Sequence, residues 1–241
     1  MSKRLRQSNR TAPPVQDQGD SEGRASRKWP LIQWTLVAAV LAIVLVAWMV
    51  TEGGMEFFPA GGYLEGFYDA QADSLLHGRI DVTPEAIGTE AFIHNGKSHG
   101  YFGPTPAIAR LPLNLLLPGM AGHWNRVLML LNTVLFVSML LLLLRRLEEL
   151  VPVNQGPRMR DLLGAALVTA TAIGSTNFYI SASRQVYHES IAWASALSFA
   201  SAVCVTSYLM RPTRKWLVLS CCTAFFAFFA RVSSGVGPIF A

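Results

Sequence analysis

Long apolar stretches separated by polar segments set the pattern of this chain. The first, residues 31–50 (LIQWTLVAAVLAIVLVAWMV), carries no charged residue. At about 1.5 Å per residue it is long enough to cross a hydrocarbon core about 30 Å thick. A cleaved secretory signal is the alternative, but its apolar core would be shorter, about 7–15 residues. Further apolar stretches follow at about 127–144, 161–180, 190–210 and 215–231. The pattern therefore predicts an all-α polytopic membrane protein with about five transmembrane helices.

The composition supports this class. Of the 241 residues, 51% are hydrophobic and 15% are charged, whereas about 25% of the residues in a soluble domain are charged. The mean hydropathy is +0.34. Cys204, Cys221 and Cys222 all lie inside apolar stretches, and we expect them to be small buried apolar side chains.

The distribution of basic residues predicts an orientation. Cytoplasmic segments of membrane proteins are enriched in Lys and Arg. With the N-terminus in the cytoplasm, fourteen of the 20 basic residues lie inside and six outside. The six outside residues are Arg79, Lys97, Arg110, Arg126, Arg184 and Arg231. Since this asymmetry accounts for the pI of about 9.4, no nucleic-acid partner is expected.

The same topology predicts the domain boundaries. Residues 1–28 are polar and rich in charge, so we expect a disordered basic tail in the cytoplasm. Residues 29–241 then form one transmembrane domain. Within it, 51–126 is a large first extracytoplasmic loop and 181–189 is a short second one. A loop as long as the first is usually functional or disordered, and its composition is not that of a disordered segment.

An acidic stripe marks the first loop. Apolar residues in 64–76 follow helical spacing, while Glu65, Asp69 and Asp73 lie four residues apart. This pattern predicts an amphipathic helix at the membrane surface, with Gly78 placed to end it. The acids are either a solvated helix face or groups with a chemical role.

Two further elements are predicted in this loop. An Asn-Gly pair inside AFIHNGKSHGYF (91–102) indicates a short β-hairpin. The segment 103–119 (GPTPAIARLPLNLLLPG) has Thr105 as a possible N-cap and a single charge, Arg110. Its apolar run is too short to span a membrane alone, so we expect a re-entrant or interfacial helix.

The second loop brings an ionisable residue to the start of the fourth span. Residues 181–190 read SASRQVYHES, which places Glu189 near the membrane boundary. Such groups are costly at this depth and face a partner or a water-filled cavity. A local Arg184–Glu189 ion pair is one interpretation. The other is that Arg184, Tyr187, His188 and Glu189 line one cavity with the first-loop acids, as general-base chemistry on an anionic substrate would require.

No cofactor is predicted. The five histidines, at positions 77, 94, 99, 123 and 188, show no i, i+4 pair and no HExxH-type spacing. Because isolated histidines also bind metals, a divalent metal ion stays an open alternative.

The order of these features resembles that of the GT-C glycosyltransferases, membrane enzymes that use polyprenyl-phosphate sugars as donors. The matching text is LEGFYDAQADSLLHGRID (64–81), NGKSHGYFGPTPAIARLP (95–112) and SRQVYHES (183–190). The resemblance covers about 31–235 and implies a bacterial plasma-membrane protein. Its donor would be a polyprenyl-phosphate-linked sugar and its acceptor a cell-envelope glycan, lipid or protein. The family has more than five spans, so the resemblance also implies that this chain is an N-terminal part.

The resemblance implies roles for individual residues. Glu65, or else Asp69, would be the catalytic base of an inverting transfer, and arginines, Arg126 among them, would neutralise the phosphate. The implied substrate-binding set is Lys97, Tyr101, Arg110, Arg184, Tyr187, His188, Glu189 and Arg231. For Arg231 the alternative is a side chain that extends to the interface without binding substrate. For the whole chain the alternative is a non-catalytic membrane module or transporter subunit whose outer loop binds a partner.

Overall fold

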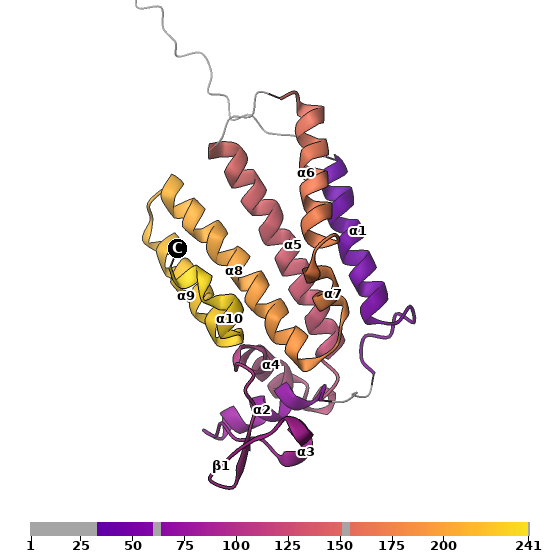
Figure 1. Cartoon of the computed structure of the whole chain (residues 1–241), viewed down its shortest axis with the longest axis vertical. Coiled ribbons are helices and arrows are strands. Elements are labelled where there is room, and N and C mark those ends of the chain that lie inside the picture. The colour runs from indigo at the N-terminus through magenta and orange to yellow at the C-terminus, as the bar shows by residue number, and fades with distance from the viewer. Residues whose placement is uncertain (1–32, 60–63, 151–154, 241) are drawn as a thin grey trace, which may run out of the picture. The chain divides into compact units, whose positions relative to one another are not determined.

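The computed structural model describes residues 33–59, 64–150 and 155–240 (Figure 1). The predicted tail, 1–28, lies outside the described residues. The helices at the predicted spans are α1 (Gln33–Val50), α5 (Asn125–Leu150), α6 (Pro157–Ala172), α7 (Thr176–Ala182), α8 (Val186–Met210) and α9 (Arg214–Ala230). The remaining elements are α2 (Phe67–Leu76), α3 (Pro84–Ile87), β1 (Phe92–His94), β2 (Lys97–His99), α4 (Thr105–Leu116) and α10 (Val232–Gly235), with 3-10 turns at Gly88–Glu90, Pro118–Met120 and Gly237–Ile239. The described chain is therefore mostly helical, as predicted.

Three helices are long and apolar enough to cross a membrane, namely α1, α5 and α8. The pair α6 and α7, bent by 57°, makes a fourth if it forms one span. The predicted fifth span, 215–231, coincides with α9. This helix has 17 residues, one fewer than α1, and it is not among the three candidates. Three or four helices among the described residues are therefore candidate spans, and the count of five stays a prediction.

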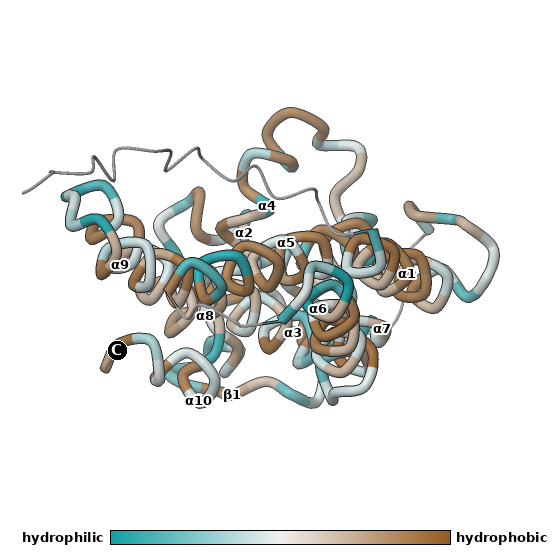
Figure 2. Tube along the Cα trace, turned by 90° about the horizontal axis from the view of Figure 1, so that it is seen from above, coloured by the Kyte–Doolittle hydropathy of each residue, from teal (hydrophilic) through white to brown (hydrophobic). Residues whose placement is uncertain are grey.

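The long helices pack through small side chains. α1 lies against α5 and α6, α5 against α8, and α8 against α9. The buried cluster of the first group includes Ala38, Ala39, Ala42 and Ala196, while large residues of α1 such as Trp34 and Trp48 are exposed. Small residues inside and large apolar residues outside are typical of helices that associate within lipid. Seen from above, the turns of α1 and α5 are largely brown, the colour of hydrophobic residues (Figure 2).

Residues 64–120, called the cap below, gather at one end of α5 and α8 (Figure 1). A separate apolar cluster holds the cap together, and Val186 of α8 joins it. Phe67 and Tyr68 of α2 meet Phe102 in edge-to-face contacts within this cluster. The segment predicted as a surface helix is therefore packed against protein on much of its surface.

The predicted end of α2 is confirmed. Gly78 has a φ of 66°, which a residue without a Cβ adopts at little cost. The N–H of Gly78 donates to the carbonyl of Leu75 (3.0 Å) and the N–H of Arg79 to that of Ser74 (2.8 Å). This pair of bonds is the Schellman arrangement that terminates many helices.

The predicted hairpin is also present. β1 and β2 pair antiparallel, and Asn95 (φ 50°) and Gly96 (φ 73°) form the turn between them. Positive φ at both central residues defines the type I′ turn that suits the twist of a two-stranded ribbon.

Two predicted details of residue placement are wrong. Thr105 is the first residue of α4 and does not cap it, because its hydroxyl donates to the carbonyl of Phe226 in α9 (2.8 Å). Of the cysteines only Cys204 is buried, whereas Cys221 and Cys222 are exposed. They precede the part of α9 that is buried, which begins at Ala224.

Candidate functional site

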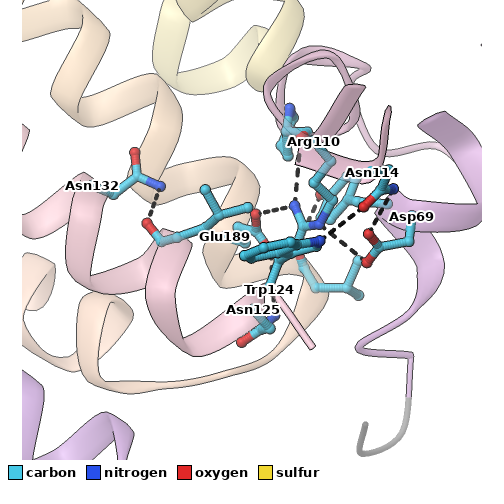
Figure 3. A network of polar contacts seen from close by, with 11 residues as sticks. Asp69, Arg110, Asn114, Trp124, Asn125, Asn132 and Glu189 are labelled. Carbon is cyan, nitrogen blue, oxygen red and sulfur yellow. Dashed lines mark hydrogen bonds and ion pairs between the residues drawn. The ribbon is translucent and has the colours of Figure 1, made fainter. Parts of the chain in front are cut away.

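A buried ion network joins α2, α4 and α8 (Figure 3). The guanidinium of Arg110 contacts Glu189 through two parallel bonds, Nη1 to Oε1 at 2.5 Å and Nη2 to Oε2 at 2.9 Å. Its Nε donates to Oδ2 of Asp69 at 3.3 Å. Arg110 and Glu189 have no exposed surface, and Asp69 is 7% exposed. Asp69 and Glu189 thus bind the same cation, although they lie 41 and 79 positions from Arg110 in the sequence.

Neutral amides and an indole complete this network. Asn114 donates from Nδ2 to Oδ1 of Asp69 (2.9 Å), and Trp124 donates from Nε1 to Oδ1 of Asn114 (2.8 Å). Asn125 donates from Nδ2 to Oε2 of Glu189 (3.2 Å). Each carboxylate therefore has a charged and a neutral donor, which is the condition under which buried charges are tolerated.

The network keeps Arg110 charged. Burial alone lowers the pKa of its guanidinium, but the charge and hydrogen bonds of Glu189, with the charge of Asp69, raise the pKa above its ordinary value. The ring of Tyr68 lies 5.2 Å from the guanidinium carbon, within range of a cation–π contact. Since two carboxylates already share this cation, Arg110 is not free to neutralise a phosphate.

Tyr68 is held by burial and by one specific bond. Its hydroxyl donates to the carbonyl of Val186 (3.0 Å). Burial raises the pKa of this phenol well above its ordinary value, and the negative charge of Glu189 adds to the effect. Tyr68 is therefore a neutral donor that ties α2 to the start of α8.

The predicted Arg184–Glu189 pair is wrong. Arg184 pairs instead with Glu52, because Glu189 faces α4 and is saturated by Arg110. Tyr187 donates to Glu90 (3.3 Å). His188 lies 2.6 Å from the hydroxyl of Ser183, measured from Nδ1. Of these four predicted residues, only Glu189 joins the network of Asp69.

The three acids of the predicted stripe have different environments. Glu65 is 8% exposed and precedes α2. Asp69, as described, lies in the buried network. Asp73 has a side chain that is 65% exposed and lies 3.6 Å from His77. The interpretation of a solvated helix face thus fits Asp73 alone.

An acidic pocket borders the network. It has a volume of about 510 Å³ and is lined by Asp69, Asp73 and Asn114 together with the turn around Pro118. Glu65 is not among the residues that line it. Asp69 accepts two hydrogen bonds, and a carboxylate has about four lone-pair sites. Asp69 thus retains acceptor capacity toward a bound molecule.

A second pocket lies where α9 ends. This arginine pocket, of about 360 Å³, is lined by Tyr101, Ser190, Arg231 and Ser233 among others. Ser190 follows Glu189 directly in the sequence. The positive charge of Arg231 also acts on Tyr101, whose pKa is raised first by burial and then by its bond to Glu90 despite that charge.

Arg231 differs from the other predicted outside cations. Five of the six have a carboxylate partner: Arg79 and Lys97 share Asp81, Arg126 and Arg184 share Glu52, and Arg110 binds Asp69 and Glu189. Among the residues that the structure describes, no carboxylate pairs with Arg231. Arg231 is therefore the cation of this set that is available to an anionic ligand.

Sequence reasoning did not single out Asn114, Trp124 or Asn125. A signal was present, because both asparagines are polar residues beside apolar runs, where an amide needs a partner. No group of three or more His, Cys, Asp or Glu side chains within the described ranges is placed to hold a metal ion.

Comparison with known proteins finds no match: no protein-family model, no curated protein and no solved structure is significantly similar to the chain.

Proposed function

We propose that this chain is a membrane glycosyltransferase or part of one. It transfers a sugar from a polyprenyl-phosphate donor to a glycan, lipid or protein outside the bacterial plasma membrane. The observation that carries the proposal is the separation of charge on the cap side. A carboxylate with spare acceptor capacity, Asp69, borders one pocket, and Arg231, which has no carboxylate partner among the described residues, borders another. Base and phosphate-binding group are the two functions that this reaction requires.

In this mechanism Asp69 is the base. An acceptor hydroxyl attacks the anomeric carbon of the donor sugar and forms the new C–O bond. The bond from the anomeric carbon to the phosphate oxygen breaks, and its electron pair leaves with the polyprenyl phosphate. The hydroxyl proton passes to Asp69. Asp69 is preferred to Glu65 because Asp69 lines the acidic pocket.

Arg110 and Glu189 then act as positioning residues. Arg110 holds the carboxylate of Asp69 through Nε, and Glu189 fixes the guanidinium in a bidentate pair. A rigid pair of this kind orients a carboxylate within a few tenths of an ångström. Neither side chain has exposed surface with which to contact a sugar.

The phosphate of the donor binds at Arg231 in the arginine pocket. A guanidinium presents two parallel donors to a phosphate. Tyr101, Ser190 and Ser233 add hydroxyls to the same pocket. Apolar residues of α9, Phe228 and Phe229, line it as well, which suits the lipid chain of the donor.

Binding of farnesyl phosphate, a short polyprenyl phosphate, tests this assignment. The protein in lipid nanodiscs should bind farnesyl phosphate about tenfold more tightly than farnesol, since hydrogen bonds to charged groups contribute about 1.5–3 kcal/mol. Arg231→Gln should remove the difference. The control is Arg79→Gln, which replaces an exposed arginine of the cap and should retain the preference for farnesyl phosphate. Equal binding of the two ligands by the unaltered protein, or unchanged preference in Arg231→Gln, would refute the assignment.

A further inference from the structure

A third pocket lies against the β-hairpin, and neither the acidic network nor the arginine pocket uses its principal side chains. This hairpin pocket has a volume of about 420 Å³ and is lined by Gln71, Leu75, Ile80, Phe92, His94 and His99 among others. Among the described residues, no Asp, Glu, Lys or Arg lines it. It therefore differs from the acidic pocket and from the arginine pocket, each of which carries a charge.

One wall of the hairpin pocket is aromatic. Phe92 is paired with His99 across the strands, and His94 lies two residues along on the same face. The rings of Phe92 and His94 are parallel within 6°, with centroids 6.4 Å apart. Phe92 is 62% exposed. The hairpin thus presents two parallel rings, both exposed, to this pocket.

The same pocket is lined by a residue with an unsatisfied amide oxygen. Gln71 of α2 is 7% exposed, and its Oε1 has no hydrogen-bond partner among the described residues. A buried amide without a partner costs free energy unless a ligand or water supplies one. The imidazole of His99 adds a donor and an acceptor when it is neutral. Polar side chains able to bind hydroxyls and exposed aromatic rings therefore line one pocket.

We propose that the hairpin pocket binds a neutral sugar ring. The C–H face of the ring packs on Phe92 and His94, and its hydroxyls bond to Gln71 and His99. An anionic sugar has no cation to pair with there, and a hydrocarbon chain would leave the amide unsatisfied. That this sugar belongs to a glycan acceptor rests on the proposed function, whereas the binding itself does not.

Saturation-transfer NMR on the nanodisc-embedded protein tests the pocket, with the methyl glycosides of glucose, galactose and mannose as probes. We expect signal from at least one of them and none from methyl glucuronide, the charged counterpart. Phe92→Ala should weaken binding at least fivefold. Ile93→Ala is the matched control, because Ile93 is similarly exposed (60%) but points to the other face of the same strand.

Two results would overturn this inference: no signal from any of the neutral glycosides, or equal losses in Phe92→Ala and Ile93→Ala. Gln71→Leu gives a second measure that leaves the exposed hairpin intact, and it should also weaken binding. The outcome is separable from that of the proposed function. A protein that binds farnesyl phosphate through Arg231 but no glycoside would retain the donor assignment and lose this one.

Discussion

Arg110 has no solvent-exposed surface, yet its guanidinium carries a full charge into the junction of the cap with α8. Removing such an ion from water costs several kcal/mol, which is offset only when the partners are well placed. Here the bidentate contact to Glu189 and the Nε contact to Asp69 provide them. Removal of any one of these three charges therefore leaves the others buried and incompletely paired.

Removal of Glu189 should destabilise the fold strongly. Glu189→Ala leaves a buried, incompletely paired guanidinium, and we expect a loss of about 3–5 kcal/mol. The control is Glu149→Ala, which breaks the exposed Arg146–Glu149 pair (31% and 48% exposed side chains) and should cost about 0–1 kcal/mol. Thermal unfolding of both variants in the same detergent measures the two losses of stability. Equal shifts in Tm would contradict the claim that the buried pair contributes more than the exposed one.

Tyr68 should resist ionisation. Because burial raises its pKa, the stability that its neutral form provides is complete below about pH 10, the pKa of an unfolded tyrosine. This stability is lost as the pH rises from there toward the folded pKa. Phenolate absorbance checks this: Tyr68→Phe should not change the alkaline titration amplitude of the folded protein but should lower that of the unfolded protein by one tyrosine. A lower amplitude in the folded state would contradict it.

At the scale of elements, turns and helix ends could be predicted from the sequence, whereas contacts between distant side chains could not. The Gly78 cap and the Asn95–Gly96 turn follow from positive φ, which few residues tolerate. The partner of Glu189 could not be predicted, because Arg184 is near in sequence while Arg110 lies 79 positions away. The start of α4 was missed by one residue because a tertiary bond from Thr105 competes with capping. The apolar pattern predicted the fifth segment, 215–231, within one residue of α9 at each end.

α1 has a cap supplied by another helix. The carboxylate of Asp161 in α6 accepts from the N–H groups of Trp34 (3.1 Å) and Thr35 (3.0 Å) and from the Thr35 hydroxyl (3.0 Å). The first N–H groups of a helix have no partner within the helix. A negative charge beside them is also attracted to the positive end of the helix dipole. One carboxylate thus caps α1 and joins it to α6.

Asp161→Ala should therefore loosen the start of α1. We expect a loss of about 0.5–2 kcal/mol, as for other N-cap removals, seen as a lower Tm in detergent. Asp161→Asn is the matched control. It keeps one amide oxygen as an acceptor and should lose less. Identical Tm values for Asp161→Ala and the unaltered protein would show that the cap contributes nothing.

At the scale of the molecule, the described helices fit a membrane through their packing as well as their length. Alanines meet at the contacts of α1, and tryptophans face outward. Three or four of the described helices are candidate spans, and both the count of five and the orientation with the N-terminus inside remain predictions.

Cysteine labelling tests that orientation. In a background without Cys204, Cys221 and Cys222, Glu85→Cys in the cap should react with a membrane-impermeant maleimide in intact cells. Gln155→Cys, just before α6, should react only after permeabilisation. Both positions are exposed, so poor access would not mask the result. The reverse pattern would place the cap in the cytoplasm and exclude transfer on the outer face.

The most direct measurement of the central claim is sugar transfer itself. The nanodisc-embedded protein would be given a radiolabelled polyprenyl-phosphate sugar with envelope glycan, lipid and protein fractions as acceptors. The account predicts transfer of label and release of polyprenyl phosphate. The rate should fall at least about 100-fold in Asp69→Asn, since a general base contributes about 10²–10⁴-fold, and should not change in Glu85→Gln. No transfer by the unaltered protein, or a normal rate in Asp69→Asn, would contradict the account.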